Sequence, residues 1–316
     1  MFDILVLGGT GFVGRSVCEK LVERSEGASG NIVVPTRRVA RAKHVQLLPT
    51  VQVVEADLND DARLAQLVAG RDAVINLVAI LHGNEAAFGK VHVELPRRLA
   101  QACRNAGVRR VVHVSALGAS PTAPSRYLRS KAAGETALRA ADLDLTVLRP
   151  SVIFGEHDRF LNLFATLQAV LPVMPLAGAQ SRYQPVWVED VAAAIVRCLD
   201  QPATIGQVIE CAGPAQYTLR QLVQLAGRLS GHPRPVIGLP ASLGCAQAMA
   251  LELLPGEPMM SRDNIDSMRV PNVATGQHPG LDSLGIRPAA LEAVAPGYLG
   301  RDQGPARLDP WRARRS

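Results

Sequence analysis

The chain has 316 residues and a formal net charge of +6, and 47% of its residues are hydrophobic against 20% charged. A chain of this length and composition is not predominantly disordered, and it fits one large domain or one domain with a smaller lobe. Aromatic residues make up only 4% of the chain. They are too few for a platform that stacks nucleic-acid bases, and no nucleic-acid-binding motif is present.

The cysteines, the histidines and the apolar runs exclude further classes of site. Five cysteines lie apart without a C-x-x-C pair, so neither a disulfide framework nor a zinc site is predicted. The best candidate for a membrane span, residues 239–254, includes Gln247 and Glu252 and stops at Pro255, so it is too short and too polar. Because the first strand begins at residue 2, we expect no signal peptide and a cytoplasmic protein. Four histidines lack metal-ligand spacing, which favours surface or core positions and predicts no metal: His82, His92, His113 and His157.

A glycine-rich turn follows the first apolar run. Residues 2–7 are typical of a strand, and residues 12–24 repeat apolar side chains at helical spacing, so the glycines occupy a strand-to-helix turn. Gly8 permits the tight turn, Gly11 lets the main chain approach a pyrophosphate, and Gly14 lets the helix pack closely on the strand. The helix start offers unpaired N–H groups and a positive dipole end to an anion. The predicted dinucleotide contacts are Gly8, Thr10, Gly11, Phe12, Val13 and Gly14.

The second strand, residues 31–34, is followed by Thr36, Arg37 and Arg38. In folds that prefer NAD an acidic residue near this strand end receives the ribose 2′-hydroxyl. Arginines in its place favour a 2′-phosphate, because each charge-assisted hydrogen bond contributes about 1.5–3 kcal/mol. We therefore predict NADP(H) in preference to NAD(H), the alternative being arginines that are simply solvated on a surface turn.

The next elements alternate between strands and helices. A third strand, residues 51–55, leads to Asp57 and Leu58. Asp57 could accept a hydrogen bond from the adenine amino group or cap the helix of residues 61–69. A fourth strand, residues 72–80, is expected to line the nicotinamide ribose with Val78 and Ala79. With a helix at 91–106 and a strand at 111–114, this alternation predicts an α/β fold, a doubly wound parallel sheet of the Rossmann type.

The candidate catalytic chemistry belongs to three residues in the segment that follows the fifth strand. Ser115 lies at the strand end, and Tyr127 and Lys131, four residues apart, share one helix face. A free tyrosine has a pKa near 10, and positive charge from Lys131 and an oxidised nicotinamide would lower it by about three units, roughly 4 kcal/mol. Tyr127 could then exchange a proton with a substrate oxygen while Ser115 polarises that oxygen. The three are the predicted catalytic residues.

The C-terminal third is less regular. Helical spacing at residues 160–171, 219–229 and 242–254 predicts a small, mainly helical lobe. Met249, Met259 and Met260 would either line an apolar pocket for a quinone-like or isoprenoid ligand or, by preference, pack in the core. The predicted division is a dinucleotide-binding core at 1–155, a late core strand and helix with the C-terminal lobe at 156–295, and a basic, flexible tail at 296–316.

These motifs resemble the short-chain dehydrogenase/reductase superfamily, in its extended and atypical branches related to nucleotide-sugar epimerases. The resemblance covers about the first two hundred residues and rests on the glycine turn, Asp57-Leu58, Ser115, Tyr127 with Lys131, and the segment at 148–155. It implies a sixth strand and turn that close on the nicotinamide, with contacts from Pro150, Ser151 and Val152. It also implies that the acidic pair in residues 184–192 anchors a late helix, with Asp190 structural rather than catalytic.

A narrower resemblance involves residues 125–135 and 261–268. They look like the branch that contains the nucleotide-binding accessory subunit of respiratory complex I and its bacterial relatives. That branch binds NADPH, which is thought to be structural in the respiratory assembly. One departure from the wider family is the sequence at 76–79, Asn-Leu-Val-Ala, where many members have smaller residues. Bulkier side chains there would alter how the nicotinamide lies and put hydride transfer in doubt.

Two functions follow from these observations. The first is an NADP(H)-dependent oxidoreductase that acts on a carbonyl or hydroxyl substrate. The second is a non-catalytic NADPH-binding accessory or assembly protein of a respiratory or quinone-linked system. The basic tail would then be solvated, touch acidic lipid at the inner face of a membrane, or contact a respiratory-complex partner, through Arg307, Arg312, Arg314 and Arg315.

Overall fold

The computed structural model describes residues 3–26, 30–253 and 259–300, and the chain divides into two compact units. Unit 1 comprises residues 1–150, 188–211 and 274–287, and unit 2 comprises residues 151–187, 212–273 and 288–316. Each unit is therefore assembled from three segments, whereas the sequence predicts boundaries after residues 155 and 295. The tail arginines from Arg307 onward lie outside the described residues.

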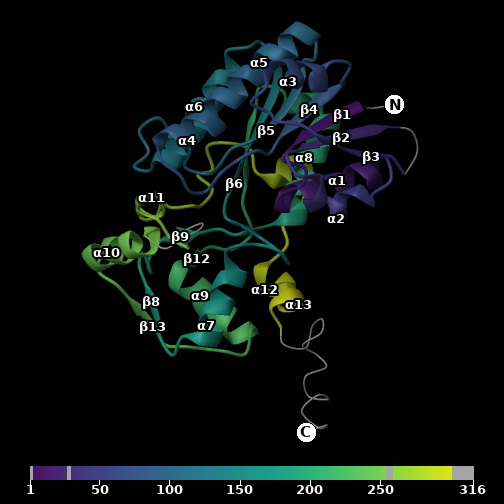
Figure 1. Ribbon diagram of the computed structural model, residues 1–316. Coiled ribbons are helices and arrows are strands. Elements are labelled where there is room, and N and C mark those ends of the chain that lie inside the picture. The colour runs from purple at the N-terminus through teal and green to yellow at the C-terminus, as the bar shows by residue number, and fades with distance from the viewer. Residues whose placement is uncertain (1–2, 27–29, 254–258, 301–316) are drawn as a thin grey trace. The chain divides into compact units, whose positions relative to one another are not determined.

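Unit 1 is built on a parallel sheet that has seven strands in the described part of the chain (Figure 1). The strand order is β11-β6-β5-β4-β1-β2-β3, so the order reverses between the neighbours β1 and β4. A reversal of this kind leaves a crevice at the carboxyl ends of the two strands, where ligands of doubly wound sheets bind. The predicted Rossmann fold is confirmed. The strands are β1 (Asp3–Leu7), β2 (Asn31–Thr36), β3 (Val51–Glu55), β4 (Ala73–Asn76), β5 (Arg110–Val114), β6 (Asp144–Pro150) and β11 (Val208–Cys211).

Helices cover both faces of this sheet. They are α1 (Phe12–Arg24), α2 (Lys43–Gln46), α3 (Asp61–Val68), α4 (Glu85–Gly89), α5 (Leu95–Ala106), α6 (Arg126–Arg139) and α8 (Val188–Asp200). Short 3₁₀ turns are η1 (Val39–Arg41), η3 (Pro202–Thr204) and η4 (Leu281–Leu284), and η2 (Lys90–Glu94) is π-helical.

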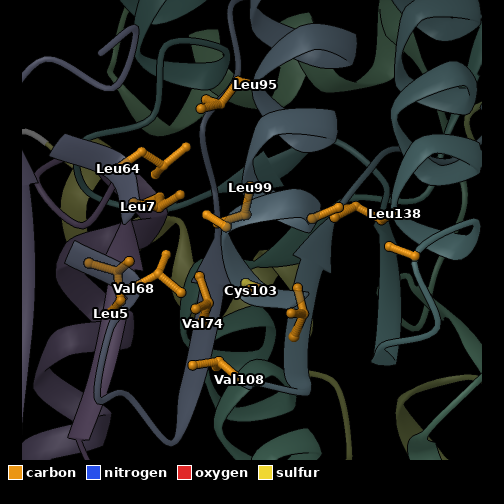
Figure 2. Close-up of a cluster of buried hydrophobic side chains, with 14 of the residues drawn as sticks. Leu5, Leu7, Leu64, Val68, Val74, Leu95, Leu99, Cys103, Val108 and Leu138 are labelled. Atoms are coloured by element: carbon orange, nitrogen blue, oxygen red, sulfur yellow. The ribbon is translucent and has the colours of Figure 1, made fainter. Parts of the chain in front are cut away.

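The core of unit 1 follows from strand alternation. Leu5 and Leu7 point to the same face of β1 and pack with side chains of α3, α5 and α6, as Figure 2 shows. The alternate residues Ile4 and Val6 are also buried, and they point to the opposite face, on which α1 and α8 pack together. The cluster in Figure 2 includes Leu64, Val68, Val74, Leu95, Leu99, Cys103, Val108 and Leu138.

Ion pairs join α1 to α8. Lys20 Nζ lies 3.1 Å from Glu189 Oε2, and Arg24 pairs with Asp200. Glu189 and Asp190 stand in the first turn of α8, where carboxylates oppose the positive end of the helix dipole. This placement gives the acidic pair a helix-anchoring role, as the resemblance implied.

Unit 2 is mainly helical. Its hydrophobic clusters include Phe154, Leu161, Leu222 and Leu291, and Leu299, inside the predicted tail, is buried with them. The helices are α7 (Leu161–Val170), α9 (Leu219–Leu229), α10 (Ala241–Glu252), α11 (Arg262–Ser267), α12 (Leu291–Val294) and α13 (Pro296–Leu299). Two-residue and three-residue strands pair as β7 (Ile153–Phe154) with β10 (Val186–Trp187), β9 (Arg182–Tyr183) with β12 (Tyr217–Thr218), and β8 (Met174–Leu176) with β13 (Val236–Gly238).

The methionines of α10 and of the chain just before α11 depart from the preferred prediction. Met249 is 51% exposed and Met259 is 46% exposed, so core packing is wrong for both. For Met249 the reason is that α10 buries its small residues: a Cβ at Gly244 would lie 2.8 Å from the Cβ of Ala177, and Ala248 is fully buried. Within residues 3–26, 30–253 and 259–300, no helix is both long enough and apolar enough to cross a membrane.

Candidate functional site

The glycine turn connects β1 to α1 and adopts the conformation that the glycines permit. Gly8 has a φ of +84°, and a Cβ on it would lie 3.2 Å from Leu77 C and Val78 N. Gly11 N–H donates to Gly8 O at 3.0 Å and closes the turn. A Cβ on Gly14 would lie 2.3 Å from Gly8 O. The tight turn at Gly8 and the close packing at Gly14 therefore follow from the backbone geometry.

The start of α1 has the features of an anion site. Gly11 is its N-cap in extended conformation, and the first turn holds no acidic residue. The first N–H groups of a helix have no partner within the helix, and glycine has no side chain to cap them. These groups lie at the carboxyl end of β1, beside the point where the strand order reverses, so they are suited to a diphosphate.

The next strand end carries the predicted 2′-phosphate contacts. β2 ends at Thr36, and Arg38 N–H donates to Thr36 Oγ1 at 3.3 Å. Arg37 and Arg38 are exposed. Because β2 is the parallel neighbour of β1, this arginine pair lies one strand away from the glycine turn at the same edge of the sheet.

The structure decides one of the two readings of Asp57. The N-cap of α3 is Asp60, whose carboxylate accepts from Ala62 N–H at 2.9 Å and Arg63 N–H at 3.2 Å. The N-cap interpretation of Asp57 is therefore wrong, because the loop is three residues longer than that reading requires. The Asp57 carboxylate is exposed and accepts from Asn59 N–H at 3.0 Å and Asn59 Nδ2 at 2.7 Å. These bonds lower the pKa of Asp57, so it is an anionic acceptor at neutral pH. Leu58, beside it, is half-buried against the core of unit 1.

β4 is shorter than predicted. It ends at Asn76, and the buried Asn76 side chain accepts from Val78 N–H at 3.2 Å, which turns the chain out of the strand. Val78 is half-buried and Ala79 is exposed. Both belong to a loop beside Gly8 instead of to the strand.

Lys131 and Ser115 are brought together in unit 1. Lys131 Nζ donates to the carbonyl of Val114 at 2.7 Å, and Ser115 follows Val114 directly at the end of β5. Lys131 is 2% exposed and Ser115 is 4% exposed. Within the described residues, Ser115 Oγ has no hydrogen-bond partner, so its bonding capacity is available to a ligand or to water.

Tyr127 is held on the first turn of α6. Ser125 caps this helix by accepting Leu128 N–H at 3.2 Å. The Tyr127 ring lies edge-on to His92, with centroids 5.6 Å apart, and against Phe88 at 6.1 Å.

The pKa shifts of Tyr127 and Lys131 in the chain alone arise from burial. Burial lowers the pKa of Lys131 to about 8 against the opposing effect of Glu135, and burial raises the pKa of Tyr127 to about 12. The direction for Tyr127 is opposite to the one that catalysis requires. The predicted lowering would therefore need the positive charge of a bound oxidised nicotinamide.

Two buried histidines were not predicted as site residues. His92 and His113 are each 2% exposed. Asn76 Nδ2 donates to His113 Nδ1 at 3.2 Å, because Asn76 Oδ1 is used by Val78. The Nε2 atom of His113 therefore carries the proton, and it has no partner within the described chain. Within the part of the chain that the structure describes, no cluster of three or more His, Cys, Asp or Glu side chains could hold a metal ion.

The residues after β6 divide between the two units. Pro150 ends β6 and its carbonyl accepts from Leu117 N–H at 3.0 Å within unit 1. Ser151 and Val152 open unit 2, where Val152 N–H donates to Asn272 Oδ1 at 2.9 Å and Ser151 Oγ contacts the same oxygen at 2.6 Å. Their contact with nicotinamide stays a prediction.

A parallel sheet that reverses its strand order beside a glycine turn, with a glycine-capped helix start at that turn, defines a dinucleotide-binding α/β protein of the Rossmann class. The model of the NAD dependent epimerase/dehydratase family matches residues 4–212, and the chain belongs to this family.

Curated relatives extend this match beyond the sheet. The chain is 35% identical over 295 residues to the mitochondrial NADH dehydrogenase [ubiquinone] 1 alpha subcomplex subunit 9 of Mus musculus, covering 91% of this chain and 77% of that protein. It is 31% identical over 242 residues to a ceramide reductase of Caulobacter vibrioides, covering 75% of this chain and 73% of the reductase.

Solved structures share the fold. An NADPH-dependent quinone oxidoreductase from Escherichia coli superposes with a TM-score of 0.71 at 22% identity, covering 92% of this chain and 98% of the other. A UDP-glucuronic acid 4-epimerase from Bacillus cereus with NAD bound superposes with a TM-score of 0.67 at 18% identity, covering 90% of this chain and 97% of the epimerase. At these identities the likeness concerns the fold alone.

Proposed function

We propose that this protein binds NADP(H) in preference to NAD(H) and transfers hydride between it and a carbonyl or hydroxyl substrate. The observation that carries the proposal is the convergence of Ser115 and Lys131 through the 2.7 Å bond from Lys131 Nζ to Val114 O, with Tyr127 one helical turn before Lys131. The chain would hold the diphosphate with the start of α1, the adenine with Asp57, and the 2′-phosphate with Thr36, Arg37 and Arg38. The ceramide reductase among the relatives supports a reductase chemistry.

In this proposal each side chain has one task. Tyr127 passes a proton to or from the substrate oxygen, and Ser115 donates a hydrogen bond to the same oxygen. Lys131 holds the nicotinamide ribose and, with its positive charge, favours the tyrosinate. The bound dinucleotide supplies or accepts the hydride.

Replacing Tyr127 with Phe tests the reaction. General acid–base catalysis contributes at least about a hundredfold to rate, so we expect Tyr127→Phe to lower turnover by about that factor and to leave NADPH binding within about twofold. The measurement is NADPH oxidation against a panel of aldehydes, ketones and quinones, with fluorescence titration for binding. Turnover equal to that of the unchanged protein would reject the role of Tyr127.

The cofactor preference has its own test. We expect Arg37→Ala with Arg38→Ala to weaken NADPH binding about tenfold or more, since each lost charge-assisted bond costs about 1.5–3 kcal/mol, and to leave NADH binding unchanged. Arg104→Ala, an exposed arginine in the last turn of α5, is the matched control. Equal weakening for both nucleotides would show that the arginines do not read the 2′-phosphate.

A second candidate function is an accessory protein that holds NADPH without turnover. Two observations favour it: the 35% identity to the complex I subunit, and the raised pKa of Tyr127 in the chain alone. Under this function NADPH remains bound through purification at one equivalent per chain, dissociates slowly, and is not oxidised by any carbonyl of the panel.

A further inference from the structure

His92 has a hydrogen-bond arrangement that fixes its protonation. Its Nε2 lies 3.1 Å from Ile80 N–H, and its Nδ1 lies 2.8 Å from Ser130 Oγ. A backbone N–H can only donate, so Nε2 must be unprotonated. A neutral imidazole has one N–H, which therefore stands on Nδ1 and donates to Ser130 Oγ. The Ser130 hydroxyl in turn donates to the carbonyl of Tyr127 at 2.7 Å.

Every donor and acceptor in this series has one consistent role. Ile80 N–H donates to His92 Nε2, His92 Nδ1–H donates to Ser130 Oγ, and the Ser130 hydroxyl donates to Tyr127 O. A doubly protonated imidazole would direct a second N–H at Ile80 N–H and break the first bond. Burial, and secondly the charge of Lys131, lower the pKa of His92 to about 3, so the neutral form prevails at neutral pH.

The backbone of His92 also contacts α6. His92 lies in the π-helical segment η2, and a Cβ at Gly134 would lie 2.1 Å from His92 O. The segment can approach α6 this closely because residue 134 is glycine. Phe88 stacks on the His92 ring at 5.5 Å, and Tyr127 meets the same ring edge-on. π-Helical turns are rare and are frequent at functional sites.

We propose that His92 is a positioning residue that joins the loop after β4 to the turn of α6 that carries Tyr127. The loop includes Val78 and Ala79, which are expected beside the nicotinamide, and the turn carries the expected acid–base residue, so the functional meaning of the link rests on the proposed function. The link itself, with its Nδ1–H tautomer, is a property of the chain alone.

The tautomer is tested without any nucleotide. Long-range ¹H–¹⁵N spectra of the ¹⁵N-labelled full chain report which ring nitrogen carries the proton, and His92→Gln identifies the signal by its loss. We expect a neutral ring protonated at Nδ1 and unchanged between about pH 8 and pH 5, because its pKa is far below the ordinary value near 6.5. A proton on Nε2, or a titration midpoint near pH 6, would overturn the proposal.

The positioning role is tested by paired variants. His92→Phe keeps a ring and removes both hydrogen bonds, whereas the His92→Gln amide can still accept from Ile80 N–H. We expect His92→Phe to weaken NADPH binding about tenfold, the effect of one to two lost hydrogen bonds, and to shift the ¹³Cζ signal of Tyr127. We expect His92→Gln to recover most of both effects. Glu94→Gln, which changes an exposed residue of the same π-helical segment and none of these bonds, is the control and is expected to leave NADPH binding within about twofold.

The outcomes separate the two proposals. An unchanged Tyr127 signal and unchanged NADPH affinity in His92→Phe would overturn the positioning role. If the unaltered protein binds neither NADPH nor NADH, the proposed function fails, and the tautomer and the Tyr127 signal still decide whether the link exists.

Discussion

Gly14→Ala is expected to destabilise unit 1 strongly and to abolish dinucleotide binding. A Cβ at this position would lie 2.3 Å from Gly8 O and 2.5 Å from Gly9 Cα, and both atoms are backbone, so no side chain can rotate away. Overpacking in well-packed interiors lowers stability by about 1–3 kcal/mol and occasionally more. We therefore expect Gly14→Ala to lower the free energy of unfolding by about 3 kcal/mol or more. Chemical denaturation measures the loss, and NADPH titration measures the binding.

The matched control is Gly89→Ala. Gly89 is also helical, as the last residue of α4, and a Cβ there would have no atom of the described chain within 4 Å apart from its neighbours and the backbone of its own helix. Alanine is favoured over glycine in helices by up to about 1 kcal/mol, so this variant is expected to be neutral or slightly stabilising. A Gly14→Ala protein that folds and binds NADPH like the original would contradict the close packing of α1 on the turn.

The parts of the fold that sequence could predict are those specified by local pattern. The helix of residues 12–24 and the strand of residues 51–55 match α1 and β3 residue for residue, because their periodicity and flanking turns agree. The glycine turn was predictable for the same reason, since the positive φ of Gly8 and the contact of Gly14 with the backbone of Gly8 and Gly9 both arise inside the first fourteen residues.

The features that the sequence predicts wrongly depend on contacts between residues distant in sequence or on single side-chain hydrogen bonds. The apolar run after residue 72 continues to residue 80, but Asn76 ends β4 by bonding to Val78 and to His113, 37 residues away. Asp57 and Asp60 both precede a helix, and only the backbone distinguishes which one caps it. The exposure of Met249 follows from the close approach of Gly244 to Ala177, 67 positions apart in sequence, which periodicity does not reveal.

In the candidate site, too, local sequence pattern predicts some residues, and contacts distant in sequence determine the others. Ser115, Tyr127 and Lys131 were identified by residue type and order, and the structure brings Lys131 to the residue before Ser115. His92 gave no signal, because metal-ligand spacing is the usual test for histidines, and its partners Ile80 and Ser130 lie 12 and 38 residues away. The direction of the pKa shift of Tyr127 could not be predicted either, since it depends on how deeply the phenol is buried.

Glu135→Ala is expected to lower the free energy of unfolding by about 3 kcal/mol, which is the lower end of the range for breaking a buried ion pair. Glu135 is 2% exposed, and its oxygens accept from Arg149 Nε at 2.9 Å and from a terminal guanidinium nitrogen at 2.7 Å, which ties α6 to β6. The side chain of Arg149 is 19% exposed and lines a surface hollow of about 450 Å³, which holds none of the predicted site residues. Water in this hollow would partly solvate the orphaned charge, which is why the lower figure is expected.

Two further variants show whether the orphaned charge causes the loss. Glu19→Ala breaks the Arg15–Glu19 pair, which has the same 2.9 Å separation but side chains 41% and 35% exposed, so we expect a loss of no more than about 0.5 kcal/mol. Adding Arg149→Met to Glu135→Ala removes the unpaired cation, and we expect the double variant to unfold at higher denaturant than Glu135→Ala alone. If the second substitution deepened the loss instead, the packing of the Glu135 side chain, rather than its charge, would be what holds α6 against β6.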